Sequence, residues 1–213
     1  SQRKVMYAVF LRKLNFTKTK LKVAQLSGYV AEHTGYHHGE DNMHSTITKM
    51  ANEFPGSNNV PLLYRGGQFG SREEGGKDAA SARYIFTKME VLTRLLFNPA
   101  DDELLERNED DGDIVEPKFY APIIPMVLVN GCQCGIGTGW SSTIPSYDPL
   151  IIIAAVKEWL EYEGDIFQDD ETCTHSDLLP EFTPWYRGFT GEIVKENENT
   201  ARQPDRQANH VKQ

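Results

Sequence analysis

The sequence predicts an α+β fold, because a pair of short helices comes first and a β-rich apolar run follows over residues 121–129. Two observations predict the helix pair. Apolar residues recur with helical spacing at Val23, Leu26 and Val30, which predicts a helix over residues 22–32. The same spacing recurs over residues 44–54, and a glycine-containing turn joins the two segments behind a basic N-terminus. This order is typical of a helix-turn-helix or winged-helix unit.

The net charge of −9 is divided unevenly along the chain. Residues 1–90 carry 13 Lys and Arg against 8 Asp and Glu, whereas residues 91–213 carry 9 against 23. No acidic residue precedes Glu32. This distribution gives the first half the electrostatic character of a polyanion-binding surface, with the acidic half facing elsewhere. A solvated basic face without a ligand is the alternative.

Composition narrows the class of protein. Hydrophobic residues make up 39% of the chain, enough for a buried core, and no apolar run approaches the roughly 18 residues of a membrane span. Three cysteines argue against a disulfide scaffold and for a reducing compartment. No signal peptide is expected. Because the chain lacks an initial Met and ends in a polar tail, we expect it to be a piece of a larger protein.

The clearest candidate for chemistry is the pair Arg83–Tyr84, which follows a glycine-rich charged loop. A third helix is predicted to begin at this pair with Ser81 as its N-cap, marked by apolar residues at Ile85, Met89, Leu92 and Leu96. A helix N-terminus and a guanidinium both favour negative charge, so together they would hold a phosphate and stabilise a phenolate nucleophile. A packing role for the tyrosine is the alternative.

The remaining segments predict an exposed loop and supporting secondary structure. Residues 98–118 contain nine carboxylates and predict a solvated acidic loop. Residues 121–129 predict β structure bent at two prolines, residues 151–160 a helix and residues 185–194 a strand. The glycines of residues 70–78 and 135–139 have the wrong spacing for nucleotide-binding loops.

Cysteine and histidine spacing predicts no metal site. Cys132, Cys134 and Cys173 are too few and wrongly spaced for structural zinc, so buried reduced thiols are expected. His37 and His38 are adjacent and would point apart, which suits a phosphate contact or a turn better than a metal. A tyrosine that attacks a phosphodiester usually needs a metal to stabilise the leaving 3′ oxygen. No carboxylates with ligand spacing lie near Tyr84 in the sequence.

Nine motifs keep one order along the chain: residues 2–5 (Gln-Arg-Lys-Val), 22–28 (Lys-Val-Ala-Gln-Leu-Ser-Gly), 36–40 (Tyr-His-His-Gly-Glu), 56–59 (Gly-Ser-Asn-Asn), 67–70 (Gly-Gln-Phe-Gly), 75–81 (Gly-Gly-Lys-Asp-Ala-Ala-Ser), 83–86 (Arg-Tyr-Ile-Phe), 122–128 (Pro-Ile-Ile-Pro-Met-Val-Leu) and 135–141 (Gly-Ile-Gly-Thr-Gly-Trp-Ser). Together they resemble the breakage-reunion region of the type IIA DNA topoisomerases, specifically the eukaryotic-type topoisomerase II family. The match covers about residues 1–150 and is weaker beyond them, where residues 184–191 carry it best.

The resemblance implies roles for individual residues. Tyr84 matches the nucleophile that becomes linked to a DNA 5′ end, and Arg83 matches the arginine that stabilises the transition state. His38, with His37 beside it, matches a position near the cleaved strand. Ile136 matches an aliphatic wedge that enters a base step, although alone it would be taken for a core residue. The DNA-binding positions implied in addition are Arg3, Lys4 and Lys77.

The resemblance also implies the organisation of the parent protein. Residues 1–145 are expected to form a winged-helix domain of the CAP-like type with a β wing, and residues 146–213 a partial α/β tower domain with a polar tail. Mg²⁺ is expected in a Toprim domain and ATP in an N-terminal domain, both outside this chain, with no metal ligand here. The expected partners are double-stranded DNA, a second copy in a homodimer, and the Toprim and ATPase regions of the parent. No membrane is expected, and the compartment would be nuclear or another intracellular one that contains DNA.

Two departures from the family pattern stand out. Ala82 occupies a position where the family usually has proline, and Cys132–Gln133–Cys134 replaces a segment that often has alanine and glutamate. The function implied is DNA cleavage and religation through a transient double-strand break, within ATP-dependent strand passage. A non-catalytic winged-helix module and a short subunit of a split topoisomerase, completed in trans, are the alternatives.

Overall fold

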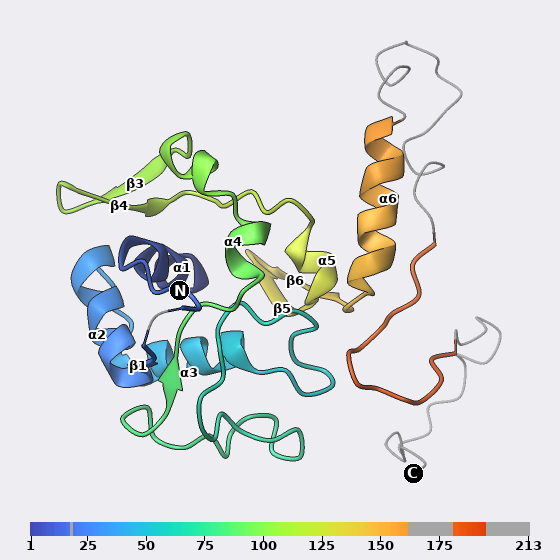
Figure 1. Cartoon of the computed structure of the whole chain (residues 1–213), viewed down its shortest axis with the longest axis horizontal. Coiled ribbons are helices and arrows are strands. Elements are labelled where there is room, and N and C mark those ends of the chain that lie inside the picture. The colour runs from blue at the N-terminus through green and yellow to red at the C-terminus, as the bar shows by residue number, and fades with distance from the viewer. Residues whose placement is uncertain (18, 162–180, 195–213) are drawn as a thin grey trace.

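Three helices near the N-terminus pack together and form one side of the core (Figure 1). They are α1 (Gln2–Leu11), α2 (Val23–Thr34) and α3 (Glu40–Ala51), in a computed structural model that describes residues 1–17, 19–161 and 181–194. Helical spacing puts Val5 and Val9 of α1 wholly inside, as it does Val23, Leu26 and Val30 of α2. The apolar faces of these helices therefore pack together in a shared core.

The predicted helix pair is confirmed, with shifted ends. Helix α2 ends at Gly35, whose φ of 55° is the left-handed geometry that closes helices. Helix α3 starts four residues earlier than predicted, because Gly39 ends the turn with a φ of 86° and the acidic Glu40 and Asp41 favour a helix N-terminus. It stops at Ala51, since Asn52 already has extended backbone.

The helix predicted from Arg83 onward is wrong. Residues 81–84 form a turn, and β2 (Phe86–Thr87) pairs antiparallel with β1 (Leu21–Lys22). Ile85, Thr87 and Met89 are buried at every second position, which is the alternation of a strand. Only the first interval of the predicted helix, from Ile85 to Met89, fits both periods, and only the single turn α4 (Thr93–Leu96) of this stretch is helical.

The acidic segment is more ordered than the predicted solvated loop. A short 3₁₀ helix, η1 (Pro99–Glu103), leads into the antiparallel hairpin of β3 (Arg107–Asp110) and β4 (Asp113–Pro117). Asp111 and Gly112 form its turn with φ values of 51° and 87°. Composition did not show that one of the nine carboxylates, Glu116, is 4% exposed.

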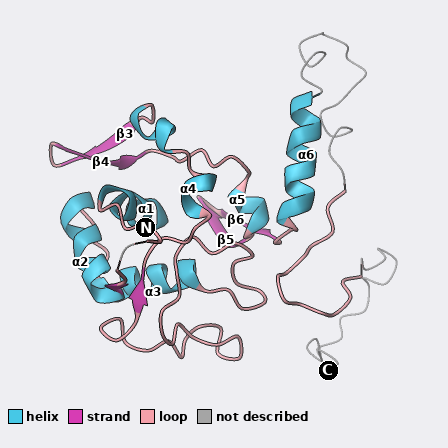
Figure 2. Cartoon of the chain, in the orientation of Figure 1, coloured by secondary structure: helices cyan, strands magenta, loops and turns pink. Residues whose placement is uncertain are grey.

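The second half mixes a confirmed helix with two corrections. Helix α6 (Pro149–Glu161) packs against α5 (Met126–Val129), the one-turn helix that occurs where β structure was predicted. Strands come instead from the glycine cluster, as the hairpin of β5 (Cys132–Gly137) and β6 (Trp140–Ile144) (Figure 2).

No strand forms over residues 185–194. The parts of the expected tower and tail at residues 162–180 and 195–213 lie outside the described residues. Among the helices that are described, none combines the length and apolar character needed to cross a membrane.

One buried side chain, Asn59, ties distant segments of the fold together. Its Nδ2 donates to the carbonyl oxygens of Val129, Tyr147 and Trp185 at 2.9, 3.0 and 3.1 Å. Its Oδ1 accepts from the backbone N–H of Arg187 at 2.8 Å. The two hydrogens of the amide therefore serve three acceptors, and Asn59 joins the end of α5 to both segments that follow it.

Replacing Asn59 with Ala should destabilise the chain by about 3 kcal/mol, because four hydrogen bonds are lost and buried carbonyls lose their donor. Urea unfolding of the chain measures this loss. The matched control is Asn42→Ala at an exposed position of α3, which should change the free energy of unfolding by less than about 0.5 kcal/mol. Equal effects of the two substitutions would contradict the role of Asn59 in joining these segments.

Candidate functional site

The Arg83–Tyr84 pair lies at the surface on a turn that α2 holds from behind. The N–H groups of Val23 and Ala24, the first two residues of α2, donate to the carbonyl oxygens of Ile85 and Ala82 at 3.0 and 3.1 Å. Within the turn, the Tyr84 N–H donates to the Ser81 carbonyl at 2.8 Å. Since Ala82 and Ile85 are buried on either side, the backbone of the pair is fixed.

Both side chains of the pair point outward from this fixed backbone. Tyr84 is 69% exposed, and Arg83 is exposed as well. Within the described residues, Tyr84 is therefore not a packing residue. The turn exposes a phenol and a guanidinium on neighbouring residues.

The electrostatic support predicted for Tyr84 needs a correction. The predicted helix N-terminus does not begin at the pair, but the N-terminus of a different helix, α2, lies against the same turn. Its first two amides are occupied by the carbonyls of Ala82 and Ile85, so they position the backbone rather than bind an anion. Within the turn itself, the cationic group on the residue next to Tyr84 is the guanidinium of Arg83.

The glycine-rich loop before the pair is folded back on itself. A Cβ at Gly70 would lie 2.4 Å from the Cα of Gly76, so only glycine fits this crossing. The carboxylate of Asp78 accepts from the Ser71 N–H at 2.7 Å, and this bond lowers the pKa of Asp78 below its usual value. Lys77, which precedes Asp78 in this loop, is exposed.

The predicted histidine pair lies in the turn between α2 and α3. His37 and His38 are both exposed, and the His38 ring meets the Tyr36 ring edge-on at 5.5 Å. They follow the C-terminal end of α2, whereas the Arg83–Tyr84 turn is held at its N-terminal end. The helix has 12 residues and so separates its two ends by about 18 Å.

Arg3 and Lys4 bind the acidic hairpin rather than standing free. Arg3 Nη1 donates to the carbonyl oxygens of Pro117, at 3.1 Å, and of Lys118. Lys4 Nζ pairs with Glu116 at 3.1 Å and also donates to the carbonyl of Thr34, the last residue of α2. Lys4 thereby satisfies a carbonyl at the negative end of the helix as well as a buried carboxylate.

Ile136 comes from a third part of the fold, the β5–β6 hairpin, where it is 80% exposed. The core position that its residue type alone suggests is therefore wrong. Cys132 on the same hairpin is a half-buried free thiol, and Cys173 lies outside the described residues.

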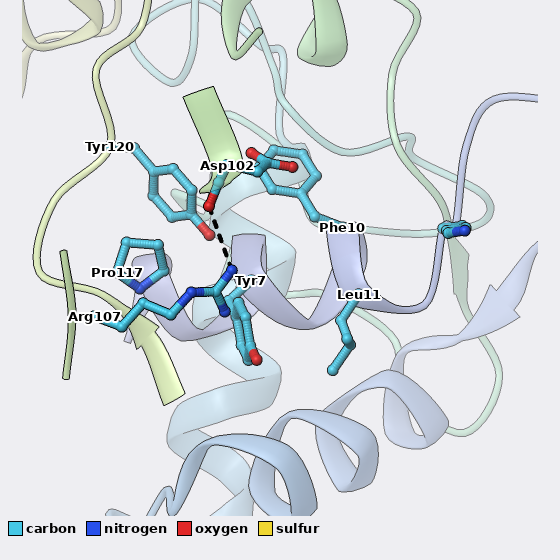
Figure 3. A pocket seen from close by; sticks show the side chains of 8 residues that line it. Tyr7, Phe10, Leu11, Asp102, Arg107, Pro117 and Tyr120 are labelled. Carbon is cyan, nitrogen blue, oxygen red and sulfur yellow. Dashed lines mark hydrogen bonds between the residues drawn. The ribbon is translucent and has the colours of Figure 1, made fainter. Parts of the chain in front are cut away.

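Within the part of the chain that the structure describes, no metal cluster accompanies the pair, and a cavity between α1 and the β3–β4 hairpin includes neither Arg83 nor Tyr84 in its lining. Within the described residues, no three His, Cys, Asp or Glu side chains come together as a metal site would require. A cavity of about 200 Å³ lies between α1 and the start of the β3–β4 hairpin, where Arg107 Nη2 donates to the Asp102 carbonyl at 3.4 Å (Figure 3). Burial raises the pKa of Tyr120 in its wall. The cavity is below the roughly 300 Å³ of ordinary ligand pockets and contains none of the predicted site residues.

Sequence reasoning missed the groups that support the site. The amides of Val23 and Ala24 are backbone atoms, so no residue type marks them. Asn59 could be noticed only as part of a motif, because its partners are 70 to 128 residues away in the chain.

The comparisons with known proteins agree with one another. The family model for the DNA gyrase/topoisomerase IV A-subunit matches residues 1–211. The mitochondrial DNA topoisomerase 2 of Dictyostelium discoideum is 50% identical over 192 residues, which are 90% of this chain and 14% of that protein. The DNA topoisomerase 2 of Saccharomyces cerevisiae is 48% identical over 192 residues, 90% of this chain and 12% of that protein.

A solved structure gives the same result. The crystal structure of the Plasmodium falciparum topoisomerase II DNA-binding, cleavage and re-ligation domain superposes with a TM-score of 0.81 at 47% identity. The match covers 92% of this chain and 24% of that one. This chain therefore spans a small part of each of the proteins it matches.

Replacing Lys4 with Met should destabilise the chain by about 3 kcal/mol, because Glu116 is left buried without its cation. The double variant Lys4→Met with Glu116→Gln should recover much of that loss, since glutamine is neutral at the same position. Urea unfolding of wild type, both single variants and the double variant gives the coupling energy. Strictly additive effects would show that the pair does not hold the hairpin.

Proposed function

Because this chain belongs to the family of the DNA gyrase/topoisomerase IV A-subunit, we propose that it is the DNA cleavage and religation portion of a type II DNA topoisomerase. The parent would make a transient double-strand break through a 5′-phosphotyrosine link during ATP-dependent strand passage. The observation that carries the proposal is the Arg83–Tyr84 turn, which α2 fixes at the surface with both side chains exposed.

The chemistry follows from this pair. The Tyr84 Oη gives up its proton as it attacks a backbone phosphorus, the bond from phosphorus to the 3′ oxygen breaks, and that oxygen takes up one proton and leaves as a 3′ hydroxyl, so no net proton is gained or lost. Arg83 stabilises the added negative charge as the phosphorus passes through five-coordination. The new phosphodiester conserves the energy of the broken bond, so the 3′ hydroxyl can reverse the reaction without ATP.

The residues that would bind DNA lie on separate elements. We assign His38 to the neighbourhood of the cleaved strand, with His37 beside it, and Lys77 and Arg3 to phosphates, because all four side chains are exposed. Lys4 would add its charge to the surface while it remains paired with Glu116. Ile136 would be the wedge that enters a base step, since it is exposed on a projecting hairpin.

The organisation of the parent follows in the same way. We assign residues 1–145 to a winged-helix domain, in which α2 and α3 form the helix-turn-helix, and residues 146–213 to the start of a tower domain. Following the family resemblance, we assign the magnesium ligands to a Toprim region outside this chain, and ATP to another region. A homodimer acting in an intracellular compartment that contains DNA completes the proposal.

The chain alone should bind duplex DNA but not cleave it, because no metal-ligand group accompanies Tyr84 in the described residues. Anisotropy of a labelled duplex measures binding, and a supercoiled plasmid with Mg²⁺ reports nicking. Binding should weaken steeply with salt, as expected for phosphate contacts. Efficient magnesium-dependent nicking by the purified chain would contradict this division of the active site.

With the Toprim region and Mg²⁺ supplied, wild-type chain should form a protein–DNA adduct that resists denaturation, and Tyr84→Phe should form none. Arg83→Ala should still form the adduct, at a rate lower by about 10²-fold or more. The matched control is Tyr64→Phe, which removes a phenol elsewhere but keeps the ring that Lys20 and Lys88 contact. An adduct that persists in Tyr84→Phe would assign the nucleophile to another residue and favour a non-catalytic role for this turn.

A further inference from the structure

The β5–β6 hairpin lies in the longest uncharged part of the chain. Residues 119–147 include no Asp, Glu, Lys, Arg or His, although 25% of all residues are charged. Exposed surface normally carries charge, yet residues 136–143 are all exposed. An exposed hairpin without charge, with large apolar side chains on it, is suited to contact with a groove or another surface.

Two large apolar side chains dominate this hairpin. Ile136 is 80% exposed and Trp140 is 83% exposed. The register pairs Ile136 with Ser141 and Gly137 with Trp140. Since paired residues share a face and successive pairs alternate, Ile136 and Trp140 point to opposite faces of the ribbon, one residue pair apart.

Glycines leave the hairpin thin around these two side chains. Trp140 stands opposite Gly137 on its own face, and Gly135 follows on the same face. The turn at Thr138 and Gly139 needs glycine, because Gly139 has a φ of 77°. The two apolar side chains therefore extend from a ribbon whose neighbouring side chains are small or absent.

The two side chains lie one residue pair apart along the ribbon, on opposite faces. One residue pair along an antiparallel ribbon is about 3.4 Å, and successive base pairs along DNA are also about 3.4 Å apart. A partner that touches one face of the ribbon meets only one of the two side chains. A groove that takes in the end of the hairpin has a wall on each side of the ribbon, so it can receive Ile136 on one side and Trp140 on the other.

We propose that Trp140 is a second apolar contact with duplex DNA, packing its indole against the sugars of the minor groove beside the step that Ile136 enters. The inference rests on the proposed function, because it requires that Ile136 meets DNA. The contact is made by a ribbon with no carboxylate to repel the phosphates and with small hydroxyl residues, Ser141 and Ser142, beside the indole. Apolar wedges of this kind open the minor groove and bend the duplex.

The test compares Trp140→Ala with a matched control, Trp159→Ala on α6, in duplex binding by the purified chain at several salt concentrations. Trp140→Ala should weaken binding by roughly tenfold at every salt concentration, the order expected when an apolar contact with nucleic acid is lost. The salt dependence should stay unchanged, because no phosphate contact is removed. Trp159→Ala should bind as wild type does, and both variants should keep the wild-type unfolding temperature, since both indoles are partly or largely exposed.

A second readout is the bend of the duplex, followed by energy transfer between dyes on its two ends. Trp140→Ala should bend the duplex less than wild type, and Trp159→Ala should not. Wild-type affinity and bend in Trp140→Ala would overturn the inference while leaving the proposed function intact. A failure of the wild-type chain to bind DNA would instead refute the proposed function itself.

Discussion

Two hydrogen bonds from the first turn of α2 determine how the candidate nucleophile is presented. Val23 is wholly buried, so the start of α2 cannot move without opening the core. Its amide and that of Ala24 hold the carbonyls on both sides of Arg83–Tyr84. Each such bond contributes only about 1 kcal/mol net, but together they fix the backbone from which the phenol and the guanidinium extend. Reactions that depend on positioning benefit from a rigid support of this kind.

The charge asymmetry of the sequence is used inside the molecule as well as on its surface. Lys4 is paired with Glu116, Arg94 holds Asp102 through two hydrogen bonds of 3.1 and 2.7 Å, and Lys118 pairs with Glu106. Lys4 and Arg94 therefore attach the acidic segment to the rest of the fold, whereas Lys118 and Glu106 pair within the segment. Of these cations, only Lys4 comes from the basic first half. The exposed cations that remain for the proposed DNA contacts include Lys77 and Arg83, together with Arg3, which is exposed although it also donates to the hairpin.

Local signals predicted the helices well and the strands poorly. The helices α2 and α6 occur where helical spacing predicted them, and Gly35 marks the end of α2. The interval from Ile85 to Met89 fits both periods, and the strand at Phe86 and Thr87 depends on pairing with Leu21 and Lys22, more than 60 residues earlier. The β3–β4 hairpin was hidden for a similar reason, because acidic composition does not show that Lys4 pairs with Glu116. At the candidate site, motifs indicated which side chains are candidates for the reaction, whereas their backbone supports carry no residue signature.

The long reach of Asn59 has a consequence for how the chain folds. Its partners Val129, Tyr147 and Trp185 follow it by 70, 88 and 126 residues, so its hydrogen bonds close only after most of the chain exists. During synthesis at about 5–20 residues per second, a nascent chain that ends before Arg187 must keep this amide solvated for seconds. Closing loops of this length costs entropy before it returns any contact energy, which slows folding. The helical core can therefore assemble early, while its junction with the later segments is completed last.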